Sequence, residues 1–102
     1  MSHAGDAVTI TDDVVAHRFE TTVAGHKAQL VYLRNGDRLI LAHTEVPDEL
    51  GGRGIGGRLV GAAIEAAIAG DLIVVPECPF ARSWLLKHAE IADRVRIEWP
   101  EE

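Results

Sequence analysis

The sequence contains one cysteine, Cys78, so no disulfide bond can form within the chain. A lone thiol fits a reducing compartment, and we expect the protein to be cytoplasmic. No apolar run approaches the roughly 18 residues that a membrane-spanning helix needs. The first residues also lack the basic and apolar regions of a signal peptide. We therefore expect no membrane partner.

Positive charge is scarce as well. Ten Lys and Arg residues stand against sixteen Asp and Glu residues, for a formal net charge of −6. This balance argues against nonspecific nucleic-acid binding, which depends on cationic side chains that neutralise phosphates. The histidines show no metal-ligand spacing, so no metal site is expected. We find no repeat or linker, and predict a single domain over residues 1–102, frayed at 1–7.

Glycine, by contrast, is concentrated in one place. Five glycines fall within the seven residues 51–57, between an apolar run and an amphipathic one. Such a cluster predicts a backbone that approaches a ligand or exposes several N–H groups. The first turn of a helix already has unpaired N–H groups and partial positive charge. The stretch therefore predicts a phosphate site helped by Arg53 and Arg58, the alternative being a flexible loop before an ordinary helix.

The first half of the chain is predicted to be an antiparallel meander. β-branched and aromatic residues favour a strand over Val14–Val23. Asn35-Gly36 between two apolar runs is a strong hairpin signal, and it leads to a strand at about Arg38–Glu45. We interpret Val8–Ile10 as a short strand and Thr11–Asp13 as a turn.

The second half is predicted to contain two helices. Apolar residues recur at helical spacing after the glycines, and proline favours the first position of a helix. A strand, a helix and a second strand imply a parallel strand pair. The expected elements are a helix over Ile55–Ile68 ended by Gly70-Asp71, a buried strand over Leu72–Val75, a helix from Pro79 with Cys78 at its N-cap, and a last strand over Arg94–Trp99. Trp84 and Trp99 are expected in the core.

The glycine stretch is similar to two known nucleotide-binding sequence patterns. Gly52–Gly57 fits the dinucleotide pattern G-x-G-x-x-G, but Thr44–Leu50 separates it from the preceding strand. The antiparallel first half also leaves no room for a doubly wound sheet. A P-loop is excluded because Gly57-Arg58 stands where Lys-Ser/Thr is required.

Instead, the chain from about Phe19 to Val95 resembles the Gcn5-related N-acetyltransferases. The resemblance rests on Val46–Leu50, then Gly52–Gly56, an alanine-rich helix and an apolar strand, which look like the acetyl-CoA-binding motif of that superfamily. It is closer to the very small single-domain members, which are similar in His43–Pro47 and in Pro76–Phe80 with Trp84 and His88.

This resemblance implies an α+β fold with a mixed, mostly antiparallel sheet, one parallel splayed strand pair and two main helices. Coenzyme A would lie in the splay, and the acetyl group of acetyl-CoA would pass to an amine: a protein lysine, an N-terminus or a small amine. The expected cofactor-binding residues are Val46, Gly51, Gly52, Arg53, Gly54, Ile55, Gly56, Gly57, Arg58 and Phe80.

Two positions depart from the superfamily pattern. Gly51 stands where Arg or Gln usually opens the motif, which leaves more of the binding to backbone amides. The tyrosine that often serves as general acid has no counterpart, since the only tyrosine is Tyr32 on an early strand.

Three residues are candidates for catalysis. A helix N-terminus stabilises a thiolate, so Cys78 is a candidate nucleophile, a candidate acid for the departing CoA, or a helix cap. His43 and Glu45 share one face of their strand just before the glycines, and either is a candidate base. Two other functions remain open: a coenzyme A-binding sensor or partner module without transfer, and a cysteine-dependent acyl-thioester hydrolase.

Overall fold

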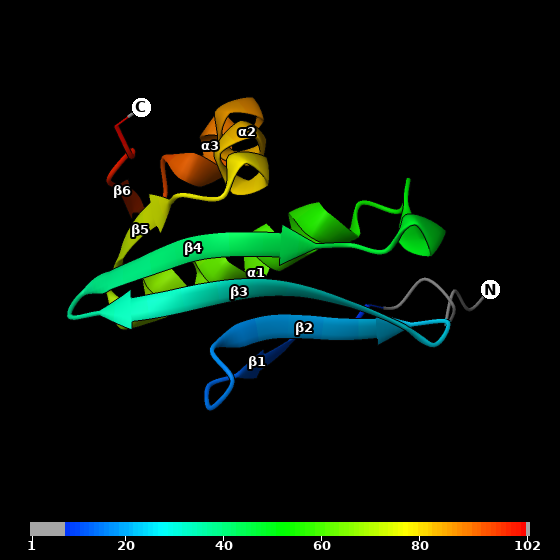
Figure 1. The fold of residues 1–102 in the computed structure, drawn as a ribbon. Helices are drawn as coiled ribbons and strands as arrows, with labels where there is room; N and C mark the ends of the chain where they lie inside the picture. Colours follow the sequence, from blue (N-terminus) through cyan, green and yellow to red (C-terminus); the bar gives the residue numbers. More distant parts are fainter. Residues whose placement is uncertain (1–7, 102) are drawn as a thin grey trace.

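The computed structural model describes residues 8–101, which form a six-stranded sheet with its strands in chain order, covered by helices (Figure 1). Neighbours from β1 to β4 are antiparallel, whereas β4–β5 and β5–β6 are parallel. The strands are β1 Thr11–Asp13, β2 Arg18–Val23, β3 His26–Asn35, β4 Arg38–Glu45, β5 Ile73–Pro76 and β6 Arg96–Ile97. The helices are the 3-10 turn η2 Asp48–Leu50, α1 Ile55–Gly70, α2 Pro79–Lys87 and α3 Ala89–Ala92. The predicted α+β class with two main helices is confirmed, and β5–β6 adds a second parallel pair.

One apolar core joins the sheet to α1 and α2. Figure 1 shows α1 crossing behind β3 and β4, where it links β4 to β5. Leu30 of β3, Leu59 of α1 and Leu85 of α2 belong to the same buried cluster. Because the apolar stripe of α1 packs on the strands, the helix start is held at the edge of the sheet where β4 ends. Within residues 8–101, no helix is long and apolar enough to cross a membrane.

A β-bulge at Ala42 sets the faces of the functional end of β4. Val31 pairs with His43 and Tyr32 pairs with Leu41, which leaves Ala42 without a partner on β3. The extra residue reverses the alternation of side chains beyond it. Thr44, opposite the fully buried Leu30, therefore faces the helices, as Leu41 does. His43 and Glu45 face the other side of the sheet.

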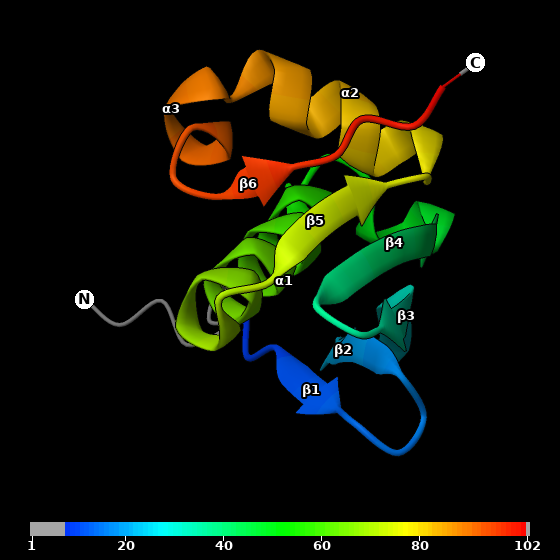
Figure 2. The same cartoon turned by 90° about the vertical axis from the view of Figure 1, so that its left-hand side faces the viewer.

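Strands β4 and β5 part after a short parallel ladder. Their pairing runs from Arg38↔Ile73 to Leu41↔Pro76, and the Cys78 amide donates a last hydrogen bond of 2.8 Å to the Leu41 carbonyl. Strand β4 then continues to Glu45, whereas the segment after β5 turns into α2. Figure 2 shows the ends of these two strands at the same edge of the sheet, near the start of α2. The predicted splayed pair is thus present.

The prediction for the N-terminal segment was wrong in three places. The strand expected over Val8–Ile10 is absent from the described residues, and residues 11–13 form β1 rather than a turn. The strand expected over Val14–Val23 begins only at Arg18. The chain turns at residues 14–17 because the Asp13 carboxylate accepts a bond from the Ala16 amide and His17 takes a positive φ of 58°. Local turn chemistry therefore overrides the β propensity of the two valines. The fraying expected for 1–7 lies outside the described residues.

Three boundaries in the second half also differ. Gly70 is the last residue of α1, and Asp71 takes the left-handed capping conformation that we expected from glycine. Strand β5 lies one residue later than predicted. Strand β6 holds two residues rather than six, because the amides of Arg94 and Val95 donate to carbonyls of the preceding α3 turn.

Candidate functional site

Six consecutive main-chain N–H groups are unpaired at the start of α1. Within residues 8–101, no amide from Gly52 to Gly57 donates a hydrogen bond, whereas the Gly51 amide donates to the Asp48 carbonyl at 2.9 Å and the Arg58 amide to the Gly54 carbonyl at 3.1 Å. No side chain of the described residues caps the helix. The start of a helix carries partial positive charge, so these groups suit an anion. Of the predicted residues, 52–57 thus present free donors and Gly51 does not.

Positive φ angles shape the loop before the helix. Gly52 has φ 79° and Gly54, the N-cap, has φ 72°. A residue with a side chain is strained in this left-handed region. At these two positions glycine is therefore required by the backbone itself, and a cavity opens beside it.

A cavity of about 290 Å³ lies over the first turn of α1. It is lined by Val46, Leu50, Gly51, Gly52, Gly54, Ile55, Gly56, Gly57, Phe80 and Trp84. Six of these ten residues belong to the stretch 51–57, and the other four come from the residue after β4, from η2 and from α2. The fold thus gathers Val46, Phe80 and six of the residues 51–57 that were predicted to bind the cofactor, together with Leu50 and Trp84. A polar backbone floor beside apolar side chains suits a ligand with both kinds of surface.

Gly56 and Gly57 lack a side chain for a different reason from Gly52 and Gly54, which is close packing against α2. A Cβ at Gly56 would lie 2.6 Å from Cζ of Phe80, and a Cβ at Gly57 would collide with the indole nitrogen of Trp84. These glycines let the aromatic rings of α2 rest directly on the backbone of α1. The expectation that Trp84 is a core residue was wrong in part: it is half-buried and lines the cavity, while Trp99 is exposed.

Two arginines add positive charge around the loop. The side chains of Arg53 and Arg58 are exposed, and within residues 8–101 neither forms an ion pair. They do not line the cavity itself. Asp48 and Glu49 on η2 oppose this charge, and Glu49 lies 3.9 Å from His26. The favourable potential for an anion therefore comes chiefly from the backbone.

Cys78 lies at the point where β4 and β5 part. It is the N-cap residue of α2, as predicted, and only 3% of it is exposed. Its Sγ is 3.2 Å from Oγ1 of Thr44, and its side chain does not cap the helix. Thr44 was not among the predicted residues, because the Ala42 bulge that turns it toward Cys78 leaves no signal in the sequence.

His43 and Glu45 form a pair on the opposite face of β4. Nε2 of His43 is 3.0 Å from a Glu45 carboxylate oxygen, and both side chains are more than half exposed, at 60% and 56%. Gln29 donates a second bond of 2.7 Å to the other carboxylate oxygen. The bonds from Gln29 and His43 lower the pKa of Glu45 below its ordinary value. The two residues are thus brought together with each other, and within residues 8–101 no bond joins either to Cys78.

The single tyrosine lies away from the cavity. The Tyr32 hydroxyl donates a 2.7 Å hydrogen bond to Asp12, and the ring is buried against Phe19. Burial and then the bond to Asp12 raise the pKa of Tyr32 to about 12. This residue is therefore structural. Among residues 8–101, no three His, Cys, Asp or Glu side chains lie together as metal ligands would.

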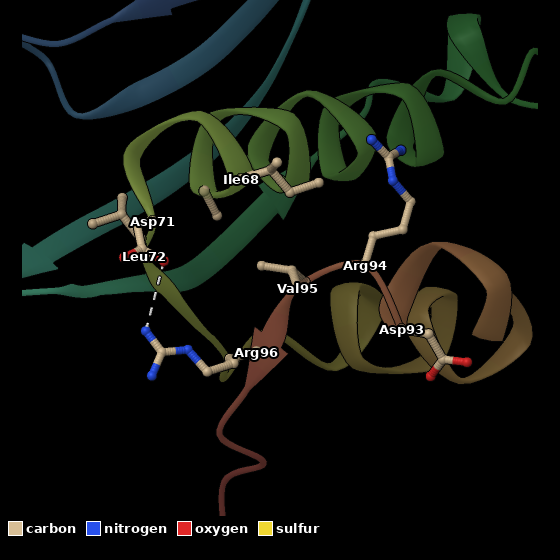
Figure 3. Close-up of a pocket in the computed structure, with 8 residues that line it drawn as sticks. Ile68, Asp71, Leu72, Asp93, Arg94, Val95 and Arg96 are labelled. Atoms are coloured by element: carbon tan, nitrogen blue, oxygen red, sulfur yellow. Dashed lines mark ion pairs between the residues drawn. The ribbon is translucent and has the colours of Figure 1, made fainter.

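A second cavity, of about 380 Å³, lies at the far end of α1 (Figure 3). Arg94 and Arg96 stand at its rim and point in different directions, the latter toward Asp71 at 3.8 Å. Arg94 pairs with Glu65 at 2.9 Å. Because each arginine has its own carboxylate and the two do not converge, this cavity lacks the features of an anion site.

Comparison with known proteins identifies a family that matches most of this chain. A model of the family described as GCN5-related N-acetyl-transferase matches residues 18–94. The chain is similar in fold to the solution NMR structure of a GCN5-like protein from Staphylococcus aureus, with 24% identity, a TM-score of 0.68, and coverage of 97% of this chain and 94% of that chain. No curated protein matches the chain in sequence.

Proposed function

Because the chain belongs to the GCN5-related N-acetyltransferase family, we propose that it binds acetyl-CoA over the start of α1 and transfers the acetyl group to an amine. The observation that carries this proposal is the run of unpaired main-chain N–H groups from Gly52 to Gly57. Several such donors at the positive end of a helix are the arrangement that binds phosphate groups. A diphosphate would accept hydrogen bonds from them.

The rest of the coenzyme would follow the surfaces next to this loop. Strand β4 has no β5 partner beyond Leu41, so its main chain near Val46 is free to pair with the amide groups of the pantetheine arm. Phe80 would pack against the apolar part of that arm. Bound there, acetyl-CoA supplies an activated acetyl thioester. The residues present therefore fit the ligand.

His43 and Glu45 would act together as the base. The lowered pKa of Glu45 makes its carboxylate a weak base, so its role is to accept the Nε2–H bond of His43 and fix the ring. That arrangement leaves Nδ1 of His43 free to take the proton of the amine. The pair is exposed on one face of β4, where an acceptor can reach it.

Cys78 would act as the acid from the other side of the same strand. Its Sγ contacts Thr44 rather than His43, and among residues 8–101 no base is hydrogen-bonded to it that could activate it as a nucleophile. In the transfer, the bond from the amine nitrogen to the acetyl carbon forms and the carbon–sulfur bond breaks. Nδ1 of His43 receives the amine proton, and Cys78 gives its thiol proton to the departing sulfur. A reducing compartment such as the cytoplasm keeps Cys78 as the thiol that this role needs.

One observation favours a second candidate, a coenzyme A-binding sensor. The only tyrosine is buried against Asp12, so no phenol serves the site as an acid. Such a protein would bind the coenzyme and transfer nothing. The two functions share the binding site and differ in turnover.

The experiment combines thermal unfolding with product analysis. Acetyl-CoA at 100 times its dissociation constant should stabilise the protein by about 2.7 kcal/mol. Gly54→Val should abolish this gain, because valine cannot easily keep the φ of 72°. Incubation with a panel of amines should yield acetylated product.

Each other outcome identifies an alternative. Release of CoA without acetylated product indicates a hydrolase, and stabilisation without turnover indicates a sensor. An absence of stabilisation in the unmodified protein, or full stabilisation of Gly54→Val, contradicts the proposed site.

A further inference from the structure

Trp84 stands at the cavity with its nitrogen edge against α1. It lies four residues after Phe80 on α2, so both rings project from one helix face onto the first turn of α1. The indole nitrogen is the atom closest to the position that a Cβ of Gly57 would take. The ring thus reaches the same turn whose N–H groups are unpaired. Its donor group lies beside that backbone.

The indole N–H of Trp84 has no hydrogen-bond partner within residues 8–101. The side chain is half-buried, but its N–H is not enclosed by the protein, so an acceptor can reach it. The cavity is the place where an acceptor from a ligand would fit.

The ring is held in place on its other side. The His88 ring stacks on Trp84 with centroids 3.9 Å apart and planes 17° apart. Nδ1–H of His88 donates a 2.7 Å bond to the Trp84 carbonyl, which fixes the histidine on the same helix. A donor that is fixed before a ligand arrives loses little conformational freedom on binding. His88 is thus a support for the tryptophan.

Resting on the proposed function, we infer that Trp84 is a binding residue of the coenzyme site, whose indole N–H donates to a phosphate oxygen held by the amides of Gly52 to Gly57. Trp84 then adds a side-chain donor at the cavity to a site built mainly of backbone. Gly57 then has two roles: its main-chain N–H is unpaired, and its lack of a side chain makes room for the indole.

Two variants test the inference by calorimetric titration with CoA. Trp84→Phe keeps an aromatic ring and removes the N–H, and Trp99→Phe is the matched control because Trp99 lies outside the cavity. A hydrogen bond to a charged group predicts that Trp84→Phe binds CoA about tenfold or more weakly. Trp99→Phe should bind as the unmodified protein does. Equal affinity of Trp84→Phe and the unmodified protein would overturn the inference.

A second readout needs no variant of Trp84. The two indole N–H resonances of the ¹⁵N-labelled protein can be assigned from Trp99→Phe. On addition of CoA, the Trp84 resonance should move downfield and that of Trp99 should stay. If the main-chain amides of residues 52–57 move and the Trp84 indole does not, the inference fails while the proposed function holds. If neither moves, the proposed function itself fails.

Discussion

Thr44 Oγ1 and Cys78 Sγ lie 3.2 Å apart, and this contact joins β4 to the N-cap of α2 where the two parallel strands part. It is the one side-chain hydrogen bond from Cys78 to the sheet within residues 8–101. The contact exists because the bulge at Ala42 turns Thr44 toward the helices. A threonine hydroxyl in this place can donate to the sulfur once the thiol has lost its proton.

Removal of the Thr44 hydroxyl should slow transfer without weakening coenzyme binding. Thr44→Val keeps the shape and leaves the thiolate of Cys78 without its donor, so we expect acetyl transfer to fall about tenfold. Steady-state rates and the dissociation constant of CoA measure the two effects. Thr44→Ser keeps the hydroxyl and should retain most of the rate. Equal rates for Thr44→Val and the unmodified protein would show that the contact has no part in transfer.

Cys78→Ala should separate binding from chemistry. The thiol faces Thr44 and not the glycine loop, so stabilisation by acetyl-CoA should persist. Loss of the acid should reduce acetyl transfer about a hundredfold or more. Intact-mass spectrometry of the unmodified protein with acetyl-CoA completes the test. An acetyl adduct that disappears in Cys78→Ala would contradict the acid role and support a nucleophile.

Alanine at two glycines of α1 should have opposite effects on stability. A Cβ at Gly61 meets nothing within 4 Å, so Gly61→Ala should stabilise the protein by about 0.5–1 kcal/mol through helix propensity. A Cβ at Gly57 collides with the Trp84 indole, which His88 holds in place, so Gly57→Ala should destabilise by about 1–3 kcal/mol. Urea unfolding measures both. If Gly57→Ala stabilised the protein as much as Gly61→Ala, the Trp84 ring would have to move aside at no cost in free energy.

The single tyrosine should titrate late. The pKa of Tyr32 is raised to about 12, first by burial and then by the bond to Asp12. In the unfolded chain the phenol ionises at its ordinary pKa of about 10. The unfolded state therefore loses this proton first, so the contribution of Tyr32 to stability is complete below about pH 10 and is lost as the pH rises toward 12. Phenolate absorbance with and without urea checks this, and identical midpoints would refute it.

Much of the fold follows from local patterns. The hairpin at Asn35-Gly36, the limits of β4 and the helix after the glycines were predicted because turn chemistry and apolar period agree there. The collection of glycines predicted a backbone-lined site, and the structure places Val46 and Phe80 around it.

The remaining features depend on packing between distant elements. Without the bulge at Ala42, simple alternation would put His43 on the buried face of Leu41, and only the register with β3 decides otherwise. The sequence alone predicts Trp84 as a core residue, and only the tertiary fold shows that its ring packs on Gly57. Pro79 and Phe80 after Cys78 predicted the N-cap, whereas the partner of Cys78 comes from a strand 34 positions away.

The central claim is that the unpaired amides at the start of α1 bind the diphosphate of coenzyme A. Titration of the ¹⁵N-labelled protein with CoA, followed through its amide resonances, tests this directly. The largest shifts should fall on Gly52 to Gly57, with small changes around Asp71 and Arg96 at the second cavity. Shifts concentrated at that second cavity, or none at the glycines at saturating CoA, would contradict the account.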